Sequence, residues 1–161
     1  MDIQLEKLSY SFKSKPILVG GRAMEYYGLR KAGDDIDLIV TEEDLTALIK
    51  LYPTRVKDIW GDFGVCPENF EIWKTIRYHG YDFYREGAVE EDTYFVVSLE
   101  KLLFMKALAM RIDKYLQDTY LISDEINKKN GELTQSITAS NKKILDSVGP
   151  IEYIEHSGPQ E

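Results

Sequence analysis

The chain has 161 residues, which suits one domain with a substantial buried core. Hydrophobic residues make up 43% and charged residues 30%, as in ordinary globular proteins, and no apolar run is long enough to cross a bilayer. The 20 Lys and Arg residues against 28 Asp and Glu give a net charge of −8, which disfavours an extended nucleic-acid surface. Cys66 is the single cysteine, and the N-terminus lacks a secretory signal, so we expect a soluble, cytoplasmic protein with no membrane partner.

The first forty residues predict a helix, a strand, a glycine turn, a second helix and a second strand. Apolar residues at helical spacing predict an opening helix over about residues 2–13. Residues 16–19 then form a short apolar run that Gly20 and Gly21 close, which predicts a strand and a tight turn. A helix is predicted over residues 22–29, and the second strand over residues 35–40.

The middle of the chain changes from helical to strand character. Thr41 followed by Asp44 resembles a capping box and predicts a helix that ends at Pro53. Residues 54–97 are rich in aromatic and β-branched side chains with glycines between them, which predicts three or four antiparallel strands. Among these, a hairpin is predicted between residues 71–78 and 81–85, with its turn at His79-Gly80.

From Ser98 onward the pattern becomes helical. Helices are predicted near residues 98–112, 114–128 and 131–147. We therefore expect an α/β core over residues 1–97, helices over residues 98–148 that pack on this core as part of the same domain, and a mobile tail over residues 149–161.

Two carboxylates follow the glycine turn at strand spacing. Asp35 and Asp37 lie two positions apart, so on a strand they project from the same face. Two ionised carboxylates at this spacing repel each other unless one is protonated or a cation binds between them, and Mg²⁺ is a suitable cation. A bare Asp-x-Asp is more often a solvated strand end. A neighbouring glycine turn, however, lets backbone N–H groups and a helix N-terminus approach a phosphate, and the combination predicts a metal and nucleotide site.

Three segments carry a resemblance to a known family: residues 18–24 (LVGGRAM), 27–30 (YGLR) and 35–40 (DIDLIV). They resemble the signature of the minimal nucleotidyltransferase superfamily, and most closely its bacterial branch of AbiEii-type toxins. This resemblance implies an α+β fold with a mixed β-sheet flanked by helices and a C-terminal helical part. It also implies two Mg²⁺ ions and transfer of a nucleoside monophosphate from a nucleoside triphosphate. Gly20 and Gly21 would contact the triphosphate, and Asp35 and Asp37 would bind metal.

A two-metal mechanism needs a third carboxylate near the acceptor, and the resemblance implies that a later strand supplies it. Asp82 is the candidate, because Tyr81 and Phe83 can pack on one face of a strand and leave Asp82 on the other. In that role Asp82 would bind the second metal ion or accept a proton from the acceptor. An ordinary exposed aspartate on a strand is an equal alternative.

The predicted helices place two charged residues on apolar faces. Lys106 lies within the stripe of Leu99, Leu102 and Leu103, and Asp118 lies on the apolar side of the next helix. A structural ion pair between the helices, or a lysine that extends to water, would explain both. Residues 97–118 are also similar to the helical Lys–Ala–Arg–Lys–Asp pattern of the same toxin branch, which implies that Lys106 binds triphosphate while Asp118 positions it.

Three positions qualify the resemblance. Arg22, directly after the glycines, is a candidate phosphate contact, although a solvated arginine at a helix start explains it more simply. Relatives usually carry Thr or Ser shortly before the Asp-x-Asp, where this chain has Ala32-Gly33. Tyr115 stands where an acid commonly follows a lysine. These departures would weaken nucleotide binding or alter the acceptor.

Three functions are compatible with these residues. The leading one is a Mg²⁺-dependent nucleotidyltransferase that modifies an RNA end, a protein or a small molecule; the toxin resemblance implies tRNA as an acceptor and a cognate antitoxin protein as a partner. The alternative is a catalytically silent nucleotide-binding or protein-interaction module with the same fold, which the missing hydroxyl before Asp35 favours. A third is an antibiotic-modifying transferase, whose cationic acceptor the acidic surface would suit.

Overall fold

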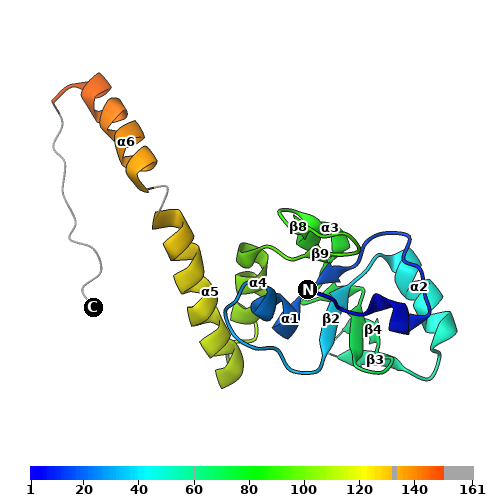
Figure 1. Cartoon of the computed structure of the whole chain (residues 1–161). Helices are drawn as coiled ribbons and strands as arrows, with labels where there is room; N and C mark the ends of the chain where they lie inside the picture. Colours follow the sequence, from blue (N-terminus) through cyan, green and yellow to red (C-terminus); the bar gives the residue numbers. More distant parts are fainter. Residues whose placement is uncertain (60, 132–133, 151–161) are drawn as a thin grey trace. The chain divides into compact units, whose positions relative to one another are not determined.

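The computed structural model describes residues 1–59, 61–131 and 134–150 (Figure 1). The chain contains two compact units, Met1–Ile126 and Asn127–Glu161. The described residues form an α+β structure with a mixed β-sheet, as the sequence predicts.

The main sheet has seven strands among the described residues, in the order β3-β4-β5-β2-β1-β9-β8. Their bounds are β1 (Ile17–Leu18), β2 (Ile36–Ile39), β3 (Val56–Ile59), β4 (Asp62–Val65), β5 (Phe70–Trp73), β8 (Val89–Glu90) and β9 (Phe95–Val96). β1 pairs antiparallel with β2, but β2 pairs parallel with β5 and β1 pairs parallel with β9. The strands that residues 54–97 contribute to this sheet pair with one another antiparallel, as predicted (β3 with β4, β4 with β5, and β8 with β9). The parallel pairings of β5 with β2 and of β9 with β1 were not predicted, because they join these strands to earlier ones across long connections.

The helices lie between and after the strands. The first unit contains α1 (Gly20–Tyr26), α2 (Glu42–Leu51), α3 (Tyr81–Arg85), α4 (Leu99–Ala107) and most of α5 (Asp113–Gly131). The second unit contains the end of α5 and α6 (Thr134–Val148). Residues 151–161 of the predicted tail lie outside the described residues. No helix in the described ranges has the length and apolar character needed to cross a membrane.

The predicted opening helix is mostly absent. Only a 3₁₀ helix, η1 (Leu5–Leu8), forms, and it is flanked by Gln4 and Ser9 with φ angles of 52° and 46°. Two left-handed residues cannot continue an α-helix. η1 buries Leu8, and the segment that follows it contacts Asp44 at the start of α2 through the backbone N–H of Lys13.

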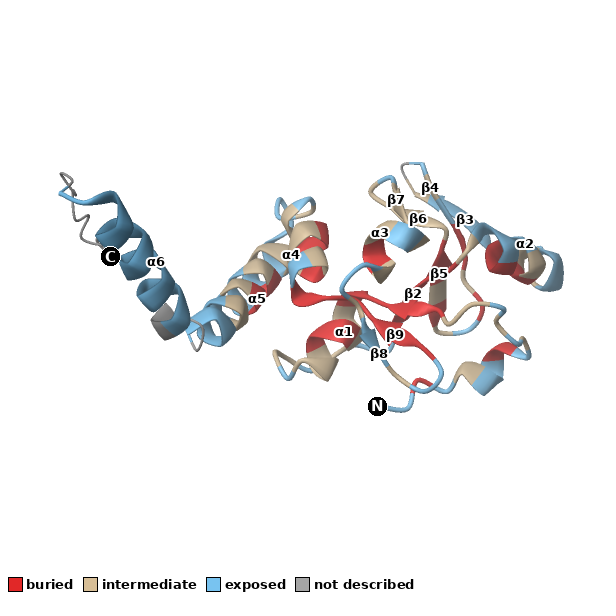
Figure 2. Cartoon of the chain, turned by 90° about the horizontal axis from the view of Figure 1, so that it is seen from above, coloured by how far each residue is buried: buried red, intermediate tan, exposed pale blue. Residues whose placement is uncertain are grey.

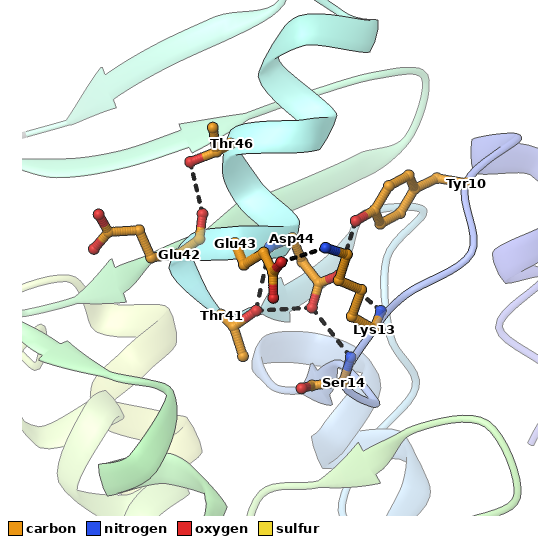
Figure 3. Close-up of polar contacts among 8 residues, drawn as sticks. All are labelled: Tyr10, Lys13, Ser14, Thr41, Glu42, Glu43, Asp44 and Thr46. Atoms are coloured by element: carbon orange, nitrogen blue, oxygen red, sulfur yellow. Dashed lines mark hydrogen bonds and ion pairs between the residues drawn. The ribbon is translucent and has the colours of Figure 1, made fainter.

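Asp44 joins the N-terminal segment to α2. Thr41 caps this helix by accepting the Asp44 N–H at 3.2 Å, which confirms the predicted capping signal. The fully buried Asp44 carboxylate accepts hydrogen bonds from Tyr10 Oη, the backbone N–H groups of Lys13 and Ser14, and Thr41 Oγ1 (Figure 3). The segment that leads into β1 is thereby fixed to the start of α2.

The hairpin in the middle of the chain differs from the prediction. β6 (Thr75–Ile76) and β7 (His79–Gly80) form a separate antiparallel pair whose turn is Arg77-Tyr78, not His79-Gly80. Both turn residues have positive φ angles, 52° and 68°, and the Asp62 carboxylate accepts their backbone N–H groups. This contact comes from β4, so the local sequence does not reveal it. Residues 81–85 form helix α3 instead of the predicted second strand.

The core lies along the central strands, where the buried residues gather in Figure 2. β2 alternates buried Ile36 and Leu38 with the half-buried Asp37, and the β3 edge strand is largely exposed. This alternation leaves one face of β2 packed while Asp37 reaches the other face.

Candidate functional site

A cavity of about 340 Å³ opens on the face of the sheet to which Asp37 points. Its lining combines charged and aromatic groups with aliphatic side chains: Val19, Gly20, Asp37, Ile59, Asp62, Trp73, Ile76, Arg77, Met105, Lys106, Ala109, Ile112 and Tyr115. Three residues that the sequence pattern assigned to a nucleotide site, Gly20, Asp37 and Lys106, therefore meet at one cavity.

The glycine turn and the Asp-x-Asp strand touch directly. The Val19 N–H donates to the Asp37 carbonyl at 3.0 Å, since β1 and β2 are neighbours. Gly20 begins α1 with φ +64°, and the Gly21 N–H donates to the Asp37 carboxylate. The Asp37 carboxylate therefore lies directly against the glycine turn.

Glu71 is the acid nearest to Asp37 in the sheet. Because β2 and β5 pair in parallel, Asp37 and Glu71 are register partners and project from the same face. Burial raises the pKa of Asp37 from 3.8 to about 6, and the charges of Glu71 and Asp35 contribute in the same direction. Lys57 pairs with Glu71 at 3.0 Å. The sequence pattern did not single out Glu71, because its proximity to Asp37 depends on pairing between strands far apart in the chain.

Asp35 and Asp82 stand differently from Asp37. Asp35 is exposed and precedes β2, and its negative charge contributes to the raised pKa of Asp37. Asp82 is an exposed residue of helix α3 and is not among the cavity-lining residues. Its placement on a strand was wrong, because Tyr84 on the same segment is buried with its hydroxyl bonded to the Ile76 carbonyl, which suits one helical turn.

The carboxylates near the cavity are ligands of the type that a hard divalent cation such as Mg²⁺ prefers. Asp37 and Glu71 present carboxylate oxygens from adjacent strands, and their mutual repulsion is the cost that a bound cation would remove. Among the described residues, no group of three or more His, Cys, Asp or Glu side chains is arranged to hold a metal ion. A metal ion would therefore draw its remaining ligands from the substrate, from water or from a shift of Asp35.

Lys106 and Asp118 form a buried ion pair. Lys106 Nζ lies 2.9 Å from Asp118 Oδ2, and the two residues are only 5% and 1% exposed. Burial lowers the pKa of Lys106, while its hydrogen bond to Asp118 acts in the opposite direction. Burial opposes ionisation of Asp118, yet hydrogen bonds from Arg30 and Lys106 outweigh it and lower the pKa of this carboxyl. The predicted ion pair between the helices is therefore present, and Lys106 also lines the cavity.

Arg22 does not line the cavity. Its Nη1 donates to Glu25 at 3.0 Å, one turn along α1. Arg22 is also not the solvated arginine of the simpler explanation, because its side chain is only 29% exposed and its Nε is buried with no hydrogen-bond partner among the described residues. Arg30, by contrast, binds Asp118, which lies 88 residues further along the chain, and no local charge pattern predicts that pairing.

Comparison of the chain with family models, curated proteins and solved structures gives no match. The function must therefore be argued from the site itself.

Proposed function

We propose that this protein is a Mg²⁺-dependent nucleotidyltransferase that moves a nucleoside monophosphate from a nucleoside triphosphate to an acceptor. The observation that carries the proposal is the packing of the Asp37 carboxylate against the Gly20-Gly21 turn in a cavity that also contains Lys106. These are the acid, the glycine turn and the cation that the resemblance to AbiEii-type toxins leads one to expect.

Each of these residues has a physical role in the proposal. Lys106 supplies a positive charge in a poorly solvated position, where its attraction for a phosphate is strong. Asp37, with Glu71 and Asp35, supplies the oxygen ligands for Mg²⁺. When bound, one or two Mg²⁺ ions would neutralise the phosphates and the leaving pyrophosphate. Glu71 replaces Asp82 as the third carboxylate in this proposal. Neither residue lines the cavity, but Glu71 is the register partner of Asp37 on the neighbouring strand, whereas Asp82 lies on helix α3.

The remainder of the cavity is mostly apolar. Trp73 and Tyr115 offer ring faces, and Ile59, Ile76 and Ile112 offer aliphatic surface. A volume of about 340 Å³ lies at the low end of the roughly 300–1,000 Å³ usual for small-molecule sites. Such a lining suits a planar base or the apolar part of an acceptor better than a second polyanion.

A catalytically silent module with the same fold is the second candidate. Two observations favour it: Asp35 is exposed and does not line the cavity, and Lys106 already has Asp118 as its partner. In that case the cavity would bind a nucleotide, or the surface a protein such as a cognate antitoxin, without transfer.

Incubation with each of the four nucleoside triphosphates, labelled on the α-phosphate, tests the proposal. The reaction contains Mg²⁺ and one acceptor class at a time: total tRNA, lysate protein, or cationic aminoglycoside-type small molecules. We expect label in one acceptor class, its loss in Asp37→Asn and Glu71→Gln, and its retention in Asp82→Asn, the matched control on helix α3, away from the strand pair that carries Asp37 and Glu71. Triphosphate binding without any transfer would support the silent module, and loss of transfer in Asp82→Asn with retention in Glu71→Gln would restore the original assignment.

A further inference from the structure

Two cations from separate parts of the chain hold the Asp118 carboxylate. Arg30, in the connection between α1 and β2, donates Nε to Oδ1 at 2.6 Å and Nη2 to Oδ2 at 2.8 Å. Lys106, on α4, donates Nζ to Oδ2 at 2.9 Å. A single buried carboxylate is thus shared between two positive charges, and the cluster carries one excess positive charge.

The two contacts are not equivalent. Arg30 engages both carboxylate oxygens in a planar fork, which is the strongest geometry for this pair, and its guanidinium stays charged at every accessible pH. Lys106 makes one hydrogen bond, to an oxygen that Arg30 already serves, and its Nζ also lies 4.7 Å from the centroid of the Tyr115 ring, which lines the cavity. Asp118 would therefore keep two hydrogen bonds if the ammonium turned away, whereas it would keep only one if the guanidinium were lost.

The cations also differ in their access to the cavity. Lys106 lines the cavity with Gly20 and Asp37, and Arg30 is not among the lining residues. Arg30 lies close to the glycine turn, because a Cβ built on Gly21 would be 3.9 Å from Arg30 Nη1. The same Nη1 donates to the Lys31 carbonyl at 2.9 Å. The ammonium is thus the cation that can reach a ligand, and the guanidinium is the one held in the protein.

We propose that Arg30 is a positioning residue that serves as the permanent counter-ion of Asp118 and so frees the Lys106 ammonium to bind a polyphosphate in the cavity. The chemical nature of the ligand rests on the proposed function. Without Arg30, Lys106 would be the sole partner of a buried carboxylate, and moving to a ligand would leave that charge unpaired. With Arg30 present, the excess positive charge is available to an anion.

A double-mutant cycle with inorganic tripolyphosphate in Mg²⁺ buffer tests this role, with affinities measured by calorimetry on the full chain. Lys106→Met should weaken binding about tenfold, the loss of one charge-assisted contact. Arg30→Met should weaken it to a similar extent although Lys106 is intact. The double variant should bind within about threefold of either single variant, because each removes the same contact. Lys101→Met, on the same helix but paired with Glu86, is the control whose effect should add to that of Arg30→Met.

Rescue separates positioning from stability. Arg30→Met combined with Asp118→Asn should recover wild-type affinity to within about threefold, since the ammonium no longer has a carboxylate to hold it, and binding should again depend on Lys106. Arg30→Lys, which keeps a charge at this site and folds more readily, should lie between wild type and Arg30→Met. Melting temperatures of all variants confirm that affinities are measured on folded protein.

Additive losses from Arg30→Met and Lys106→Met, or no recovery with Asp118→Asn, would overturn the inference, as would a wild-type protein that does not bind tripolyphosphate. The proposed function is judged separately by label transfer. A protein that shows the cycle and the rescue but transfers no label keeps the role of Arg30 and loses the enzymatic activity. One that transfers label with additive losses keeps the activity and loses the role of Arg30.

Discussion

The carboxylate of Asp37 fills the space that a side chain at Gly20 would need. A Cβ built on Gly20 would lie 1.9 Å from Asp37 Oδ2, and the backbone there has φ +64°, a conformation that L-residues rarely adopt. Gly20 is thus required by both conformation and contact. The turn is shaped around the acid that the proposed chemistry uses.

Replacing Gly20 with Ala should destabilise the protein more than any similar change nearby. Gly28→Ala, at φ +72° with no atom within 4 Å, isolates the backbone cost, which is roughly 1–2 kcal/mol. Gly20→Ala adds the clash with Asp37 and should cost about 1–3 kcal/mol more. Gly21→Ala, whose Cβ would meet its nearest neighbour at 3.9 Å, should change the free energy of unfolding little. Urea unfolding of the three variants checks the order; equal costs at Gly20 and Gly28 would contradict the contact.

The raised pKa of Asp37 should appear as a pH dependence of stability. Burial raises this pKa from 3.8 in the unfolded chain to about 6 in the folded protein, so the folded state binds the extra proton between these values. Stability from this group is therefore greatest at low pH and falls as pH rises from about 4 to about 6. Asp37→Asn should remove that dependence and, without metal, should melt at or above the temperature of wild type at pH 7.

The measurement is the difference in melting temperature between wild type and Asp37→Asn from pH 4 to pH 8. Other carboxyl groups titrate in both proteins and cancel. Mg²⁺ should raise the melting temperature of wild type above pH 6, where Asp37 is ionised, and should have no such effect in Asp37→Asn. A wild-type protein that gains stability relative to the variant as pH rises would show that this acid is stabilised in the folded state.

Asp44 should be one of the most sensitive polar positions in the fold. Asp44→Ala leaves the donors of Tyr10, Lys13 and Ser14 without their shared acceptor at the start of α2, and should cost about 2–4 kcal/mol of unfolding free energy. Glu43→Ala, which removes an exposed ion pair with Lys13, should change the free energy of unfolding little and is the matched control. Similar costs at the two positions, measured by urea unfolding, would contradict the role of Asp44.

Tyr78→Gly should stabilise the β6–β7 hairpin. Tyr78 has φ 68°, a conformation that destabilises a residue with a side chain, and its ring is 81% exposed, so burial stabilises it little. Glycine removes this cost at about 0.5–1 kcal/mol, although a more flexible unfolded chain offsets part of the gain. Thermal unfolding should show a higher melting temperature, and the conservative variant Tyr78→Phe should leave it unchanged. A lower melting temperature for Tyr78→Gly would show that the tyrosine ring contributes to packing.

The sequence by itself determined the elements whose signals are local. The strand, glycine turn, helix and Asp-x-Asp strand over residues 16–40 follow from short apolar runs and glycines, and the start of α2 follows from Thr41 and Asp44. The contact between Asp37 and the glycine turn could also be anticipated, because the two strands are joined by one short helix and connection. Such features depend on propensity and capping, which act over a few residues.

Only the tertiary structure decided which distant residues complete the site. Glu71 takes its place beside Asp37 because β5 pairs in parallel with β2, whereas a local reading of alternation favoured Asp82, which is helical. The turn at Arg77-Tyr78 depends on the Asp62 carboxylate, and Arg30 meets Asp118 across 88 residues. Strand pairing and buried ion pairs are set by packing between segments far apart in the chain, and the pattern of any one segment does not specify its partner.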